Sequence, residues 1–165
     1  RSVAGCQVFL QMLWYICHRN LTITQHVYKI NQLQHARFFK NFDGLKAHMK
    51  KHAEILRPKF EAIISRFNKE LFGLGIARWT EPKGGYFISL NVMNGCAKKV
   101  VELCREAGVV LTGAGAPYPY GLDPDDSNIR IAPSYPPVDE LMTATKLLCI
   151  CVKLAAAEKL LSEME

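Results

Sequence analysis

One arginine of this sequence stands where it could bind an anion. Arg130 is the only charged residue of the short apolar run at 128–132, which follows a loop rich in glycine and proline. A planar guanidinium can hold a carboxylate through two parallel hydrogen bonds, and a strand that begins at the mouth of a loop would present it well. An arginine on an exposed strand face fits the same spacing, so the run alone leaves both interpretations open.

Three other groups have the residue types, but not the full pattern, of a ligand site. The segment Gly-Ala-Gly-Ala at 113–116 lacks the lysine and the following helix of a phosphate-binding loop, which favours a shaped surface turn. His48 and His52 are one helical turn apart and could share a metal, but no third ligand is evident and exposure on a basic helix face is favoured. Cys149 and Cys151 would lie on different sides of a helix, which argues against a redox pair or a chelate.

Periodic apolar residues predict the helices of the first half of the chain. The spacing predicts a helix over residues 30–41 and a longer amphipathic helix, which starts with Asp43 as its N-cap and runs toward Leu71. Pro58 should kink or divide the longer helix, because it removes a backbone donor. Residues 1–28 indicate only a weak helix followed by an extended link.

The second half predicts a small sheet with helices. Short β-prone runs alternate with helical periodicity, which indicates an α+β fold: a small antiparallel or mixed sheet with helices packed on it, preceded by the long helical arm. The first two strands should form an antiparallel hairpin, and Gly108 should cap a helix. The expected elements are strands at 76–80, 86–91, 109–112 and 129–132, and helices at 97–107 and from beyond Pro137 to about residue 161.

The composition is that of a folded protein with a basic surface. The chain has 165 residues, 49% hydrophobic and 22% charged, and a net charge of +6 that lies mostly in the helical stretch 37–59. A solvated helix face explains this charge, since no aromatic residues interleave with it as in a nucleic-acid groove. The alternative is a non-catalytic basic module for a polyanion or a protein partner, which a salt titration against duplex and single-stranded nucleic acid would reveal.

The cysteines and the apolar N-terminal segment indicate in which cellular compartment the protein is expected. Most of the six cysteines lie inside apolar helical patterns without a complete secretory signal before them, which predicts free buried thiols in a cytoplasmic protein. The segment at 3–17 is interrupted by Gln7 and Gln11 and is too short to cross a bilayer, so no transmembrane helix is expected. The chain begins at Arg1 and not at methionine, which suggests a piece of a longer protein.

Four segments, taken in their order and spacing, resemble a known family. They are NQLQHARF at 31–38, HMKKHAEILRPKF at 48–60, PKGGYF at 82–87 and GVVLTGAGAPYPYGLDPDDSNIRIAP at 108–133. Together they resemble the C-terminal part of fold-type I pyridoxal-phosphate-dependent aminotransferases, most nearly a bacterial group described as aspartate aminotransferases. The resemblance implies that residues 1–42 are an N-terminal remnant and linker helix from the large domain, and that residues 43–165 are the C-terminal small domain.

The resemblance also implies the roles of individual residues. Arg130 matches the family's arginine that grips the α-carboxylate of the substrate, where a fork of donors would hold the Cα–H bond perpendicular to the cofactor ring. Gly85, Tyr86 and Gly115 would shape the mouth of the substrate cleft. Neither a catalytic nor a cofactor-binding residue is expected within this chain.

By the same resemblance, the complete protein transfers an amino group between an amino acid and a 2-oxo acid, such as aspartate and 2-oxoglutarate. It would use pyridoxal 5′-phosphate and form a homodimer, without nucleic-acid or membrane partners. The family's Schiff-base lysine ends a serine-rich motif, and none of the thirteen lysines here lies in such a motif. The chain alone is therefore expected neither to hold the cofactor nor to catalyse the reaction.

Overall fold

The computed structural model describes residues 25–164, with side chains from residue 29 onward. The chain divides into two compact units, Arg1–Ile55 and Leu56–Glu165, and each unit is described by itself. The weak helix and the extended link predicted for residues 1–28 lie outside the described residues, except at residues 25–28, where the extended link was wrong because these residues are helical. The domain boundary expected after residue 42 stays a prediction.

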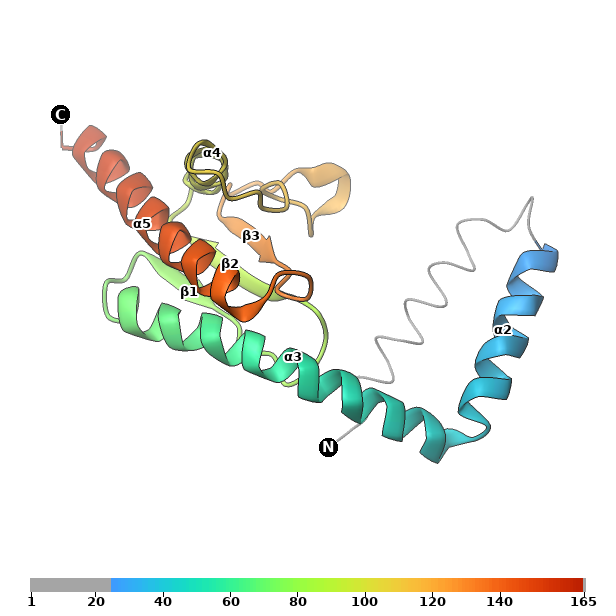
Figure 1. Ribbon diagram of the computed structural model, residues 1–165. Coiled ribbons are helices and arrows are strands. Elements are labelled where there is room, and N and C mark those ends of the chain that lie inside the picture. Colours follow the sequence, from blue (N-terminus) through green and yellow to red (C-terminus); the bar gives the residue numbers. More distant parts are fainter. Residues whose placement is uncertain (1–24, 165) are drawn as a thin grey trace. The chain divides into compact units, whose positions relative to one another are not determined.

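Two helices with a tight link between them make up the described part of the first unit. They are α2 (Gln25–Phe39) and the beginning of α3 (Phe42–Glu70) (Figure 1). The side chain of Asn41 accepts a hydrogen bond from the backbone N–H of Gly44 at 2.9 Å, which is the geometry of an N-cap. The prediction that Asp43 caps this helix was therefore wrong. Asp43 lies inside the first turn, where its carboxylate instead complements the positive end of the helix.

The sequence predicted that Pro58 would kink or divide the long helix. In the structure, α3 is not divided there but continues through Pro58. A proline removes one backbone donor, and the remaining hydrogen bonds of a 29-residue helix are enough to carry it through that position. Beyond Pro58, Ile63 and Phe67 are fully buried, so this end of α3 is held by its packing in the second unit.

A three-stranded antiparallel sheet forms the centre of the second unit. Its strands are β1 (Ala77–Trp79), β2 (Ile88–Val92) and β3 (Asn128–Ile131), in the order β1-β2-β3. The hairpin predicted for the first two strands is confirmed, with Arg78 opposite Asn91. The α+β fold is likewise confirmed.

The strand predicted at 109–112 does not form. Val109 and Leu111 rest on the core while Val110 is 88% exposed, so the side chains alternate as in a strand. A strand, however, needs a neighbour that pairs with its backbone groups. The free edge of β3 makes one backbone–backbone hydrogen bond with the loop that comes after this run, from the N–H of Gly115 to the carbonyl of Asn128 at 3.1 Å. The apolar run therefore packs without joining the sheet.

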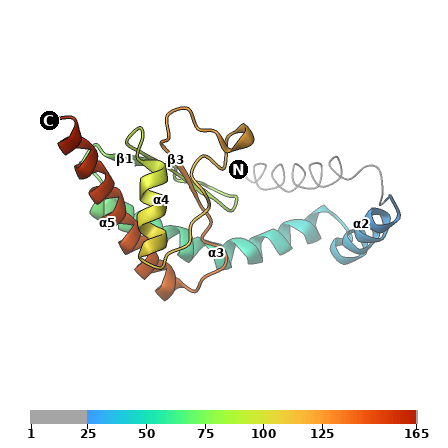
Figure 2. The ribbon, with the colours of Figure 1, turned by 90° about the horizontal axis from the view of Figure 1, so that it is seen from above.

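One face of the sheet is apolar and is covered by helices. Alternate residues of β2 and β3 are buried on this face, and α4 (Ala97–Glu106) and α5 (Val138–Ser162) pack with α3 around them (Figure 2). The core includes Ile63, Phe67, Ile88, Leu90, Val92, Val100, Ile129, Ile131, Leu148 and Val152. The periodicity that predicted these elements is thus the periodicity of a single core.

The predicted end of α4 and the predicted thiols agree with the structure. Gly108 has φ +86°, the backbone N–H of Val109 bonds to the carbonyl of Cys104, and that of Gly108 bonds to Arg105, which together form a Schellman motif. The four described cysteines, Cys96, Cys104, Cys149 and Cys151, are free and buried. Burial raises the pKa of the Cys104 thiol to about 12 and that of Cys149 to about 11, so both are protonated at neutral pH.

Candidate functional site

The face of the sheet opposite the core is polar. Because side chains alternate along a strand, Ser89 and Asn91 of β2 and Asn128 and Arg130 of β3 share this face. The amide nitrogen of Asn128 donates to the Ser89 hydroxyl at 2.8 Å and to the Asn91 side-chain oxygen at 2.7 Å. These two bonds tie β2 to β3 beside the arginine.

Arg130 is held on this face without an acidic partner. It lies directly opposite Ser89, whose short side chain leaves room for it, and its guanidinium carbon is 4.6 Å from the centre of the Phe87 ring. None of the ion pairs among the described residues involves it. Its charge is therefore not neutralised by an acidic side chain of the described residues.

Two buried polar atoms of the described side chains have no hydrogen-bond partner, and both are on this face. They are the Nε of Arg130 and the Oδ1 of Asn128. Buried polar atoms in folded proteins are nearly always hydrogen-bonded, so each exception needs an explanation. A functional site is one such explanation, and it distinguishes this face from the satisfied core.

The loop before β3 is fastened by Asp123. Its carboxylate accepts backbone hydrogen bonds from Ser127 and Asn128, each at 2.8 Å, and from Asp125 at 3.1 Å. Burial acts to raise the pKa of the Asp123 carboxyl, but these three donors favour the ionised form and bring the pKa below its usual value. The start of β3, and with it the position of Arg130, is fixed by an ionised side chain.

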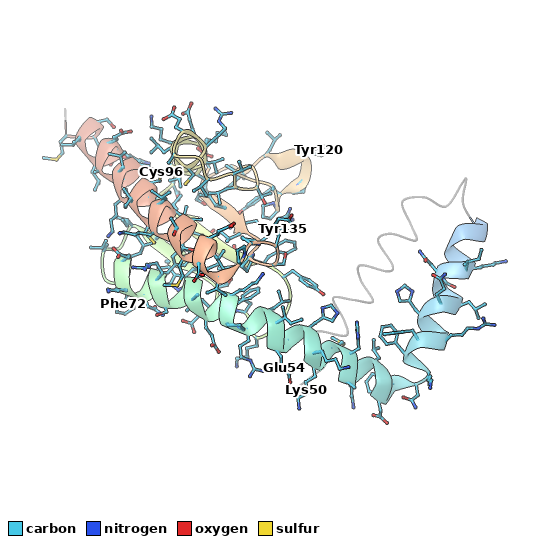
Figure 3. All side chains as sticks on the ribbon, viewed as in Figure 1. Lys50, Glu54, Phe72, Cys96, Tyr120 and Tyr135 are labelled. Atoms are coloured by element: carbon cyan, nitrogen blue, oxygen red, sulfur yellow. The ribbon has the colours of Figure 1, made fainter. Side chains whose placement is uncertain are left out.

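Three residues, Gly85, Tyr86 and Gly115, were expected at the mouth of the cleft. The structure explains why position 115 is a glycine. It is buried with φ +74°, and a Cβ built on it would lie 2.7 Å from the Gly121 carbonyl oxygen. The loop segment at 113–116 leads only into the short turn η1 (Pro119–Gly121), without the helix of a phosphate-binding loop. Tyr120, in that turn, is 98% exposed and points away from the loop (Figure 3).

Gly85 and Tyr86 lie in the turn before β2, but the contact to Arg130 comes from their neighbour Phe87. Gly85 has φ +95° with open space around its Cα, and Tyr86 is 39% exposed. The sequence had singled out Gly85 and Tyr86 and missed Phe87. The alternation of side chains along a strand could have revealed Phe87, because it precedes Ser89 by two residues and so falls on the same polar face.

The two histidines that could share a metal contact one another. Their Nε2 atoms are 3.0 Å apart, and the His48 ring packs edge-on against Phe38 and Phe39. No cluster of three or more potential metal-ligating side chains occurs within residues 29–164. Most of the basic residues around this pair, between 37 and 59, are exposed, as expected of a solvated helix face.

The described residues fit a carboxylate better than they fit a covalently held pyridoxal phosphate. A Schiff-base lysine needs a partly desolvated setting in which its amine can be neutral. None of the thirteen lysines is buried: ten are exposed, and the half-buried Lys59, Lys153 and Lys159 each donate a hydrogen bond to another residue. No reaction step is therefore assigned to a cofactor on this chain.

Residues 12–164 match the family model described as aspartate amino-transferase, which is more than nine-tenths of the chain. The chain belongs to the aspartate aminotransferase family. It is 52% identical over 130 residues to an aspartate aminotransferase from Corynebacterium glutamicum, a match that covers 79% of this chain and 30% of that relative. The chain thus spans about a third of the length of the curated relatives it matches.

Solved structures of the family have the same fold. The aspartate transaminase of Corynebacterium glutamicum superposes with a TM-score of 0.76 at 51% identity, over 79% of this chain and 31% of that one. An α-aminoadipate aminotransferase from Thermus thermophilus, at 18% identity and a TM-score of 0.59 over 69% of this chain and 28% of that one, shares the fold alone. Among residues 25–164, no helix combines the length and apolar character that a membrane span requires.

Proposed function

We propose that the complete protein transfers an amino group between an amino acid and a 2-oxo acid, and that Arg130 holds the α-carboxylate of both substrates. The observation that carries this proposal is a guanidinium on a strand whose own buried Nε has no hydrogen-bond partner and which forms no ion pair with an acid of the described residues. A cation kept free in this way on a folded scaffold suits an anionic ligand. Membership of the aminotransferase family supplies the reaction class.

Aspartate with 2-oxoglutarate is the substrate pair we propose. The support is the 52% identity to a relative named aspartate aminotransferase. We further propose pyridoxal 5′-phosphate as the cofactor, a homodimer as the assembly and the cytoplasm as the compartment, all from the family resemblance. The cofactor would supply the electron sink for the reaction, and the residues that hold it would come from the rest of the protein.

The test replaces Arg130 in the complete protein. Arg130→Leu leaves the substrate carboxylate unpaired in a closed cleft and should remove about 3 to 5 kcal/mol of transition-state binding, or roughly two to four decades in kcat/KM. Arg130→Lys should recover only part, because it keeps the charge but loses the planar fork, so kcat falls as KM rises. Steady-state kinetics measures both variants, with cofactor occupancy followed by absorbance.

Arg78 provides a matched control. It is an exposed arginine on the polar face of the same sheet, opposite Asn91. Arg78→Leu should leave kcat/KM near the wild-type value. Near-wild-type turnover by Arg130→Leu with the cofactor fully bound would show that another residue holds the carboxylate.

A further inference from the structure

We propose that Phe87 is a positioning residue that orients the Arg130 guanidinium for a carboxylate by stacking beneath it. The inference rests on the proposed function of Arg130 and adds a residue to it. The guanidinium carbon lies 4.6 Å from the centre of the Phe87 ring, well inside the range of a cation–π contact. Phe87 is 47% exposed, so burial in the core does not account for its place.

Stacking on an aromatic ring can orient an arginine while its N–H donors and its positive charge stay available for a ligand. Arginines are commonly fixed by a carboxylate, which consumes two N–H donors and neutralises the charge. An aromatic face contacts the plane of the guanidinium and leaves its in-plane donors free. Arg130 has this second arrangement, since none of the ion pairs of residues 29–164 includes it.

The pairing of β2 with β3 brings the two side chains together. Arg130 is opposite Ser89, and Phe87 precedes Ser89 by two residues, which makes Phe87 the diagonal neighbour of Arg130 on the same face. Long and aromatic side chains can bridge such a diagonal across antiparallel strands. On the other side of Arg130, the amide of Asn128 is already engaged by Ser89 and Asn91, so the ring is the only described group stacked on the guanidinium.

Two substitutions of Phe87 distinguish the effect of its aromatic face from the effect of its apolar bulk. Phe87→Leu keeps an apolar side chain but removes the π face, and it should lower kcat/KM of the complete protein for carboxylate substrates by about 3- to 30-fold. Phe87→Tyr keeps the face and should stay within about 3-fold of the wild type. Phe72 is an equally aromatic but 77% exposed residue elsewhere in the unit, and Phe72→Leu should have no effect.

A double-mutant cycle tests whether Phe87 acts through Arg130. In the Arg130→Leu background there is no cation to orient, so Phe87→Leu should change kcat/KM by less than about 2-fold. Equal effects of Phe87→Leu in both backgrounds would overturn the inference, because the ring would then contribute independently of the arginine. Wild-type kinetics for Phe87→Leu would overturn it as well.

A spectroscopic measurement keeps the inference separate from the proposed reaction. With ¹⁵N-labelled arginine, the Nε–H resonance of Arg130 is identified by its loss in Arg130→Leu. Phe87→Leu should move this resonance and speed its exchange with water, whereas Phe87→Tyr and Phe72→Leu should leave it in place. An unchanged resonance in Phe87→Leu would disprove the positioning role whatever the protein catalyses. A shifted resonance in a complete protein without transaminase activity would instead reject the proposed function alone.

Discussion

At Gly115 the loop before β3 passes close to its own backbone. Its φ of +74° belongs to the left-handed region, and a Cβ there would also lie 3.2 Å from the Asp123 backbone nitrogen. A side chain at this position would thus disturb the residue whose carboxylate fastens β3. The role of Gly115 that follows from the structure is to let the loop close, which in turn places Arg130.

We expect Gly115→Ala to destabilise the chain by at least about 1 to 2 kcal/mol, the strain of an L-residue in the left-handed region. The close approach to Gly121 adds to this strain. Urea unfolding followed by circular dichroism measures the change. Gly113→Ala is the control, because a Cβ there meets no atom within 4 Å, and it should shift stability by less than about 0.5 kcal/mol. Equal stabilities of the two variants would refute the close-packed loop.

The ionised carboxylate of Asp123 should make the stability of the folded chain depend on pH. Its pKa is lower in the folded chain than in the unfolded chain, so its contribution to stability is complete above the ordinary aspartate pKa and is lost as the pH falls through the folded value. Asp123→Asn should therefore be less stable than the wild type at neutral pH, and the difference should shrink only in strong acid. Thermal unfolding across a pH series tests this.

Asp125 offers a matched control in the same loop. It is exposed, and its side chain takes no part in the hydrogen bonds that Asp123 accepts. Asp125→Asn should have the thermal midpoint of the wild type at every pH. A stability difference for Asp123→Asn that stays constant down to strong acid would mean that the ionised carboxylate is not the stabilising group.

At the scale of elements, the sheet is anchored to α3 by aromatic packing. Phe67 is fully buried and its ring centre lies 5.4 Å from that of Trp79 on β1. A second link joins the same helix to α5, where Lys153 donates to Glu70 at 2.8 Å. The hydrogen bond and charge of Lys153 lower the pKa of Glu70, but this pair is partly exposed and solvent screens it. Apolar packing is therefore the stronger link.

Truncating Phe67 should consequently be severe. Phe67→Ala removes a buried ring and should reduce the free energy of unfolding by about 3 to 5 kcal/mol, measured by urea denaturation. Phe72, five residues on and just beyond the end of α3 (Figure 3), is 77% exposed and serves as the control. Phe72→Ala should change stability by less than about 0.5 kcal/mol. A loss of that small size for Phe67→Ala would contradict the assignment of the core.

At the scale of the whole molecule, the first unit leaves apolar side chains bare. Ile30, Leu33 and Phe38 of α2 are 61%, 53% and 66% exposed. Large apolar side chains that one helix leaves exposed are often covered by another part of a protein or by a partner. In the complete protein and the homodimer that we propose, the rest of the protein or the second subunit would provide that cover.

We therefore expect the isolated chain to associate with itself. Sedimentation velocity should show the average mass rising with concentration, and the double variant Leu33→Ser with Phe38→Ser should reduce the association by removing apolar contacts. A chain that sediments as a monomer over a wide range of concentration would argue against this expectation.

The isolated chain should also form no specific adduct with pyridoxal phosphate. None of its lysines is buried, so no amine is preorganised and neutral for a Schiff base. Borohydride reduction and peptide mapping should find scattered labelling of exposed lysines. One lysine labelled stoichiometrically and saturably would refute this.

Elements with local signals could be predicted from the amino-acid sequence. The antiparallel hairpin, α4 with its Gly108 terminus, α5 and the strand that carries Arg130 all follow from apolar periodicity and turn residues, which act over a few positions of the chain. The family could be inferred from four short segments for the same reason. Arg130 stood out as a lone cation in an apolar run, which left two interpretations open, and its match to the family's arginine favoured the carboxylate role.

Tertiary structure decided what depends on distant neighbours. The run at 109–112 has the composition of a strand, but strands exist only in pairs, and the sheet of the described residues pairs only β1, β2 and β3. The N-cap of α3 is Asn41 and not the predicted Asp43, because the tight link from α2 sets where the helix begins. The contact of Phe87 with Arg130 is a product of strand register, which joins residues more than forty positions apart.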